Sequence, residues 1–196
     1  MKKLWLLAFA ASLPLSAHAA PLIADGISYT LTKTDTANPL VENFSLAISG
    51  INTATDTEGG RTGINAIAFT DPTTGNAVSG SLAGFVFVDG GLNSTGCNGT
   101  GNFYCLDNTS IPPTPNTLLG STLTLNYSIT LGSGSWDNYH PDFKIDWVGT
   151  QNNYDLVSLP IDVTTSTPPP GIPEPMTLSL LGIGLLGLGT IRHLKG

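Results

Sequence analysis

Basic residues are scarce in this sequence. Its 196 residues include seven Lys and Arg against fourteen Asp and Glu, which gives a formal net charge of −7. Residues 20–163 contain only three of the basic residues, namely Lys33, Arg61 and Lys144. So acidic a surface repels the phosphate backbone of nucleic acids and the headgroups of anionic lipids. We therefore expect no nucleic-acid binding.

Known catalytic and metal-binding patterns are missing as well. Residues 20–163 contain one histidine, His140, and no Gly-x-Ser-x-Gly nucleophile elbow. The sequence has no His-Glu-x-x-His pair, no phosphate-binding loop and no Asp-x-Asp-x-Asp-Gly calcium loop. We therefore expect a protein that is not an enzyme and that holds no cofactor and no metal. A secreted hydrolase with an unrecognised site is the enzymatic alternative.

The first residues have the three-part pattern of a secretory signal peptide. Lys2 and Lys3 precede an apolar run at 4–15, and Ala17 and Ala19 supply the small residues that signal peptidase requires. We expect cleavage after Ala19, which makes residues 1–19 the signal peptide and the chain an exported protein. An uncleaved N-terminal anchor is the alternative.

Only two cysteines are present, Cys97 and Cys105, within a glycine-rich segment. Seven residues separate them, whereas a thioredoxin-like motif has two, and a metal centre would need further ligands. An exported chain meets an oxidising compartment, where such a pair can form a disulfide. We expect a Cys97–Cys105 disulfide that acts as a loop staple and stabilises the fold by roughly 2 to 3 kcal/mol.

Helical periodicity is missing before the C-terminal tail, whereas polar and apolar residues alternate in many short segments. This alternation predicts strands at 27–34, 44–48, 64–69, 84–89, 121–131, 143–148 and 155–163. Turn-forming residues lie between them, as at 71–75 and 132–135. We expect one all-β domain at 20–163, an antiparallel β-sandwich with a jelly-roll-like arrangement. Pro160 places its strand at a sheet edge or at a bulge.

A cluster of aromatic and polar residues precedes the expected strand at 143–148. Its members are Trp136, Asp137, Tyr139, His140 and Asp142. Rings beside carboxylates are typical of sugar-binding grooves, because the rings pack on apolar C–H faces while the polar groups bind hydroxyls. The same residues can instead close one end of the sandwich as a plug. The plug is the favoured interpretation, and the groove predicts a lectin-like, carbohydrate-binding module.

The C-terminal tail has three parts after a Thr/Pro-rich linker at 164–172. Pro173, Glu174 and Pro175 come first, and residues 176–191 then contain neither charge nor proline. These 16 residues would form a transmembrane helix about 24 Å long, short for a hydrocarbon core of about 30 Å. Arg192 and Lys195 follow, so the positive-inside bias leaves the C-terminus in the cytoplasm.

The order of these parts, at residues 173–196, resembles the bacterial PEP-CTERM sorting signal. The resemblance implies that an exosortase, a membrane cysteine protease, recognises and removes the tail. This chain departs from the family pattern at its basic end, where Arg192 and Lys195 replace a run of adjacent arginines. An ordinary C-terminal anchor, a buried apolar helix and a eukaryotic GPI signal are the alternatives.

The same resemblance implies a location and a role. We expect export through the inner membrane, attachment to the membrane by the C-terminal helix before processing, and a cell-surface or extracellular location afterwards. The implied function is that of a surface or matrix protein associated with exopolysaccharide and biofilm. The expected partners are signal peptidase, an exosortase-type protease and polysaccharide.

Overall fold

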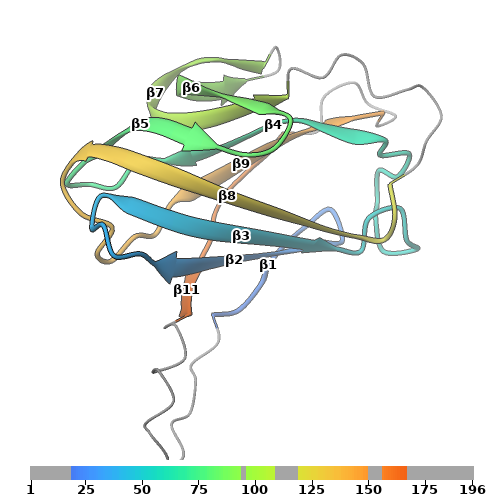
Figure 1. The fold of residues 1–196 in the computed structure, drawn as a ribbon. Coiled ribbons are helices and arrows are strands. Elements are labelled where there is room, and N and C mark those ends of the chain that lie inside the picture. Colours follow the sequence, from blue (N-terminus) through green and yellow to red (C-terminus); the bar gives the residue numbers. More distant parts are fainter. Residues whose placement is uncertain (1–18, 94–95, 109–118, 150–155, 167–196) are drawn as a thin grey trace, which may run out of the picture.

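Two β-sheets packed face to face make up the computed structural model (Figure 1), which describes residues 19–93, 96–108, 119–149 and 156–166. Eleven strands and no helix occur within these ranges. The six-stranded sheet has the order β1 (Leu22–Ala24), β2 (Ile27–Asp35), β3 (Val41–Ser49), β8 (Thr122–Ser133) and β5 (Asn76–Ser81), with β11 (Val163–Ser166) also paired to β2. The five-stranded sheet has the order β10 (Leu156–Pro160), β9 (Asp142–Val148), β4 (Gly63–Thr70), β7 (Gly96–Asn108) and β6 (Phe85–Asn93).

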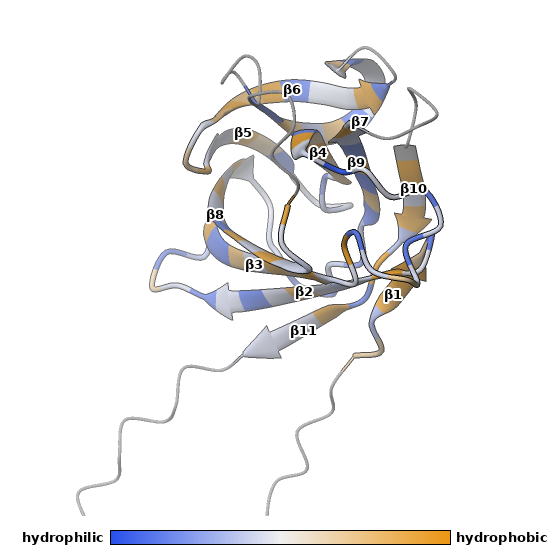
Figure 2. Cartoon of the chain, turned by 90° about the vertical axis from the view of Figure 1, so that its right-hand side faces the viewer, coloured by the Kyte–Doolittle hydropathy of each residue, from blue (hydrophilic) through white to orange (hydrophobic). Residues whose placement is uncertain are grey.

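The expected all-β sandwich is therefore confirmed. Figure 2 shows the two sheets enclosing one interior. Residues 1–18 of the expected signal peptide and the expected helix at 176–191 lie outside the described residues. In the part of the chain that is described, no helix is long and apolar enough to cross a membrane.

Alternation along the strands directs every second side chain into this interior. On β2, Ile27, Tyr29 and Leu31 are fully buried, and the residues between them are half-buried. An aromatic cluster joins the two sheets, because Phe69 of β4 stacks on Tyr127 of β8 with ring centroids 5.8 Å apart. Burial of such rings is the main favourable contribution to folding.

The strand expected at 155–163 is in fact two strands in different sheets. β10 ends at Pro160 and lies at the edge of the five-stranded sheet, which confirms the position that proline predicts. Ile161 is buried and donates its N–H to the Pro141 carbonyl. The chain then enters the other sheet, where β11 pairs with β2 in parallel and so departs from the antiparallel expectation. Thr164–Ser166, expected in the linker, therefore belong to the sandwich.

The glycine-rich segment around the cysteines is also a strand, β7, rather than a simple loop. Its pairing with β6 shifts register between Gly91↔Gly99 and Asp89↔Tyr104, so residues 100–103 bulge out of the ladder. Cys97 and Cys105 are bridged with their Cα atoms 5.7 Å apart, which confirms the expected disulfide. We call residues 91–93 and 96–105 the β6–β7 arch.

A buried ion pair fixes the loop between β3 and β4. Asp56 and Arg61 have no exposed side-chain surface. The Arg61 Nε and Nη2 groups donate to the two Asp56 carboxylate oxygens at 3.0 and 3.2 Å. Backbone N–H groups of Asn52 and Gly59 donate to the same carboxylate at 2.9 and 3.0 Å. The guanidinium carbon lies 4.8 Å from the centroid of the Trp147 ring, a cation–π contact.

Candidate functional site

The aromatic residues of the 136–142 loop lie inside the sandwich. Trp136 is 2% exposed and Tyr139 is 6% exposed. Their rings pack edge to face with centroids 5.0 Å apart, and each contacts Phe44 of β3. Trp136 Nε1 donates to the Leu40 carbonyl at 3.2 Å, and the Tyr139 hydroxyl donates to the Thr70 carbonyl at 2.8 Å. The loop therefore plugs the end of the sandwich and offers no ring face to a sugar.

The polar residues of the same loop remain at the surface. Asp137, His140 and Asp142 are exposed. Asp137 and His140 border a hollow of about 330 Å³ with Lys33 of β2 and Thr165 of β11. Asp142 starts β9 and does not line this hollow. Trp136 and Tyr139 also border the hollow, although both are buried. Four of the five predicted loop residues therefore surround the hollow, and Asp142 belongs to the neighbouring strand.

Lys33 and Glu42 form a partly buried charge cluster next to this hollow. Lys33 Nζ lies 2.8 Å from Asp35 Oδ1 and 3.8 Å from Glu42 Oε1. Burial raises the pKa of Glu42, and the positive charge of Lys33 opposes that rise. Among the described residues, Glu42 Oε2 has no hydrogen-bond partner. Because Lys33 already balances the carboxylates around it, the cluster resembles a structural ion pair more than a cation site.

The outer surface of the six-stranded sheet has an unusual composition. Ile23 of β1 and Val78 of β5, the two end strands of this sheet, are exposed apolar side chains. On β2, on β3 from Asn43 onward and on β8 up to Ser128, alternation directs every second side chain away from the core, and all of these are Ser, Thr, Asn or Ala. We call this surface the hydroxyl face; its residues are Ser28, Thr30, Thr32 and Thr34 of β2, Asn43, Ser45, Ala47 and Ser49 of β3, and Thr122, Thr124, Asn126 and Ser128 of β8. Register places them in rows across the sheet, for example Thr32, Ser45 and Asn126.

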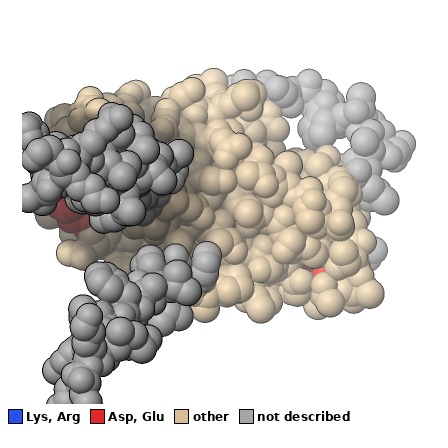
Figure 3. Space-filling view, turned by 60° about the horizontal axis from the view of Figure 1, so that its bottom comes forward, with Lys and Arg blue, Asp and Glu red and all other residues tan. Residues whose placement is uncertain are grey.

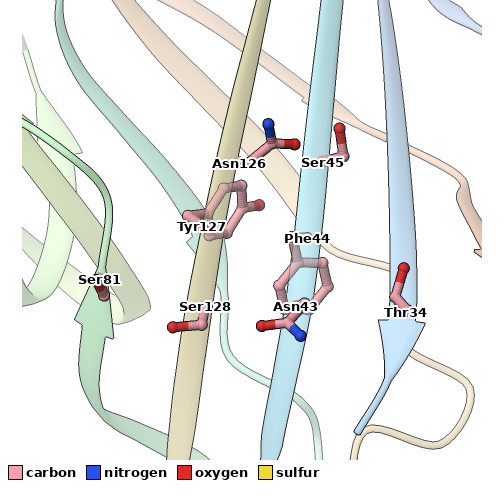
Figure 4. Close-up of a pocket in the computed structure, with 8 residues that line it drawn as sticks. All are labelled: Thr34, Asn43, Phe44, Ser45, Ser81, Asn126, Tyr127 and Ser128. Carbon is pink, nitrogen blue, oxygen red and sulfur yellow. The ribbon is translucent and has the colours of Figure 1, made fainter.

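A groove of about 350 Å³ lies within the hydroxyl face (Figure 4). Asn126 is directly opposite Ser45, and Ser128 is directly opposite Asn43. Within the described residues, none of these four side chains makes a hydrogen bond to another protein group. Their donors and acceptors are therefore available to a ligand. This groove was not among the predicted sites, although the alternation of Ser and Thr along β2 and β8 was a usable signal.

Charge is almost absent from this side of the molecule. On the part of the surface that grey residues do not cover, Figure 3, which looks toward the six-stranded sheet, shows tan with small red spots and no blue. The outer surface of the five-stranded sheet is less open than that of the six-stranded sheet, because the β6–β7 arch covers part of it. There Leu92 and the disulfide pack on Ala66 and Ala68. Asp146 and Asp107 lie at nearby positions, and burial raises the pKa of both carboxyls.

The predicted sorting residues Pro173, Glu174, Pro175, Arg192 and Lys195 lie outside the described residues. In the described part of the chain, no group of three or more His, Cys, Asp or Glu side chains could hold a metal ion.

Comparisons with known proteins add little to this description. No protein-family model matches the chain, and no curated protein matches it either. An uncharacterized protein from Nocardia farcinica with an immunoglobulin-like fold is similar over 65% of this chain and 82% of its own, with 12% identity and a TM-score of 0.35. ACE19, the collagen binding subdomain of the Enterococcus faecalis surface protein ACE, is similar over 70% of this chain and 95% of its own, with 8% identity and a TM-score of 0.35. Such values support no inference about a ligand.

Proposed function

We propose that this chain is an exported, non-enzymatic protein of the cell surface or extracellular matrix. In this proposal an exosortase-type protease sorts it through the tail at 173–196, and the mature sandwich associates with exopolysaccharide. The observation that carries the proposal is the Cys97–Cys105 disulfide of the β6–β7 arch. Disulfides persist in oxidising compartments and are rare in the cytosol, so the bridge supports the export that both chain ends predict.

The two alternative functions have weaker support. A lectin-like site at the 136–142 loop would need an exposed ring face, and both rings are buried in the core. The hollow beside the loop is lined by polar groups such as those of Lys33, Asp137 and His140, and also by Trp136, Tyr139 and Val163. A hydrolase would need a nucleophile beside a base. The exposed His140 has Asp162 as its charged neighbour, at 4.0 Å.

Intact mass and fractionation test this proposal. The protein recovered from the extracellular matrix of its own host should begin at Ala20 and end between Pro173 and Met176. It should co-extract with the exopolysaccharide and should leave the matrix when that polysaccharide is digested. A protein that stays in the cytoplasm with its N-terminal 19 residues attached would contradict export. A mass that retains Arg192 would show that the tail is a permanent anchor.

A further inference from the structure

We propose that the hydroxyl face binds a neutral polysaccharide, with its groove as the central contact. This inference rests on the proposed function, because it names the surface and the ligand class through which a matrix protein would be held. The groove has a volume of about 350 Å³, which lies within the range of roughly 300 to 1,000 Å³ that small-molecule sites occupy.

The chemistry of the groove matches that of vicinal sugar hydroxyls. Each Asn amide offers two donors and one acceptor, and each Ser hydroxyl offers a donor and an acceptor. The pairs Asn126–Ser45 and Asn43–Ser128 place four such groups side by side. A sugar ring likewise presents neighbouring hydroxyls that both donate and accept. Every hydroxyl can therefore find a partner without a charge on either side.

The hydroxyl face is also rigid before a ligand arrives. The β2–β3 and β3–β8 registers contain no bulge, so the rows of side chains are regular. Ser, Thr and Asn lose less rotamer entropy on ordering than Lys, Arg or Glu, and Thr is stiff at χ1. A preformed array of short side chains lowers the entropy cost of binding a polymer.

The distribution of charge on the domain favours an uncharged partner. Residues 20–163 hold thirteen acidic and three basic residues, yet the hydroxyl face has no ionisable side chain. A polyanion would be repelled by the domain as a whole. A polycation would prefer the acidic residues elsewhere and would leave the hydroxyl face empty. An uncharged, hydroxyl-rich polymer fits both the local chemistry and the overall charge.

Two double variants of matched composition test the site in the mature exported protein. Ser45→Ala/Asn126→Ala removes groove donors, whereas Asn102→Ala/Ser158→Ala changes the same residue types at exposed positions of the five-stranded sheet. Gel retardation by dextran, soluble cellulose derivatives and galactomannan measures binding to neutral polymers, and alginate serves as the anionic probe. Thermal unfolding checks that both variants fold.

The wild type should be retarded by at least one neutral polymer, and the retardation should not change between about 0.05 and 0.5 M salt, since no charge is involved. The groove variant should bind about 10-fold or more weakly, because several hydrogen bonds are lost. The control should bind like the wild type.

Three results would overturn the site: equal binding by the groove variant, salt-sensitive binding to alginate alone, or a wild-type dimer that the groove variant loses in sedimentation. If the protein is found in the matrix but no neutral polymer retards it, the site fails while the proposed function stands. If the groove binds a neutral polymer but the protein stays in the cytoplasm, the proposed function fails and the site stands.

Discussion

Asp56 and Arg61 occupy a region of the loop between β3 and β4 that water does not reach. The ion pair is bidentate, with both side chains fully buried. Burial alone would raise the pKa of Asp56, but hydrogen bonds from Arg61, Gly59 and Asn52 hold it below the usual 3.8. A buried ion pair of this kind adds little to the stability of the fold when it is intact. Removal of one partner is strongly destabilising, because the other charge then stays buried without that partner.

We therefore predict that Asp56→Ala lowers the free energy of unfolding by about 3 to 5 kcal/mol. The variant loses the carboxylate that accepts loop N–H groups as well as two hydrogen bonds from the buried guanidinium of Arg61. Urea unfolding followed by tryptophan fluorescence measures the change. Asp25→Asn, at an exposed turn position, is the control and should stay within about 0.5 kcal/mol of the wild type. Equal stability of Asp56→Ala would mean that the pair is solvated.

In four other carboxyl groups the pKa is shifted in the opposite direction from that of Asp56. Burial raises the pKa of Glu42, Asp71, Asp107 and Asp146 above 4.5 for Glu and 3.8 for Asp. A raised pKa means that the folded state binds the proton more tightly than the unfolded chain does. The stability that these groups contribute is therefore complete at low pH and is lost as the pH rises through their folded pKa values. For Asp56, whose pKa is lowered, stability is present above 3.8 and is lost as the pH falls.

The melting temperature should accordingly rise as the pH falls from 7 to about 4.5, and should fall below about pH 3.5 as Asp56 takes up a proton. Differential scanning calorimetry across this range measures the profile. Asp146→Asn keeps an oxygen for the hydrogen bond from Asn65 and removes the titrating group. In that variant the melting temperature should rise less as the pH falls. A melting temperature that falls steadily from pH 7 downward would contradict the assignment of buried carboxyls.

Substitution of Trp136 can show whether the 136–142 loop is a plug or a sugar-binding groove. We predict that Trp136→Ala costs about 3 to 5 kcal/mol of stability, because it leaves a cavity beside Phe44 and Tyr139. Asp137→Ala, its exposed neighbour, should change stability by no more than about 0.5 kcal/mol. Chemical unfolding measures both. If Trp136→Ala kept its stability and lost only oligosaccharide binding, the loop would be a ligand site.

The β6–β7 arch is the element whose stability depends most directly on a covalent bond. Cys105 is fully buried against Ala66 and Ala68, and Cys97 closes the arch over them. We predict that Cys97→Ala/Cys105→Ala lowers stability by roughly 2 to 3 kcal/mol through the unfolded state. Amide exchange should accelerate in β6 and β7 and should stay slow in β2, β3 and β8. Thiol labelling of the denatured, non-reduced wild type should give no label, and two labels per chain would contradict the bridge.

Strands in which every second residue is apolar and faces the core could be predicted from the sequence. Segments 27–34 and 121–131 correspond closely to β2 and β8. By contrast, β5 has few apolar residues, and the first part of β7 is rich in glycine and asparagine, so these segments lack a clear alternation and pair with their neighbours β8 and β6. The short β1 follows from the turn at Asp25 and Gly26, whose φ angles are 51° and 75°. That Asp-Gly pair is a strong hairpin signal and could have been used.

The candidate site was harder to predict from the sequence than the strands were. The residue types of the 136–142 loop suit a plug and a groove equally, and only the fold shows which way the rings point. The hydroxyl face depends on β3 pairing with β8, two strands that are distant in sequence. Alternation alone identifies the outward residues of each strand. It cannot tell that three such strands lie side by side.

At the scale of the whole molecule, the two ends of the sandwich lie at the same sheet edge. β1 pairs with β2 at Leu22↔Tyr29, and β11 pairs with β2 at Val163↔Leu31 (Figure 1). The last strand ends at Ser166, before the predicted sorting triplet. Removal of the signal peptide and of the tail would therefore break no ladder pairing among the described strands. The fold is compatible with processing at both ends.

Glu174 is the residue on which the sorting hypothesis can be tested most sharply. Pro173 and Pro175 bias the triplet toward an extended conformation, so the expected helix cannot begin before Pro175, and Glu174 is the one charge there that a membrane protease could bind. We predict that Glu174→Ala leaves an uncut precursor in the inner membrane while its N-terminus is still exported. Glu174→Lys should be worse, because a cation outside erodes the charge asymmetry set by Arg192 and Lys195. Fractionation with an antibody to the sandwich measures this. A Glu174→Ala protein that reaches the outer surface at wild-type size and yield would show that the tail is only an anchor.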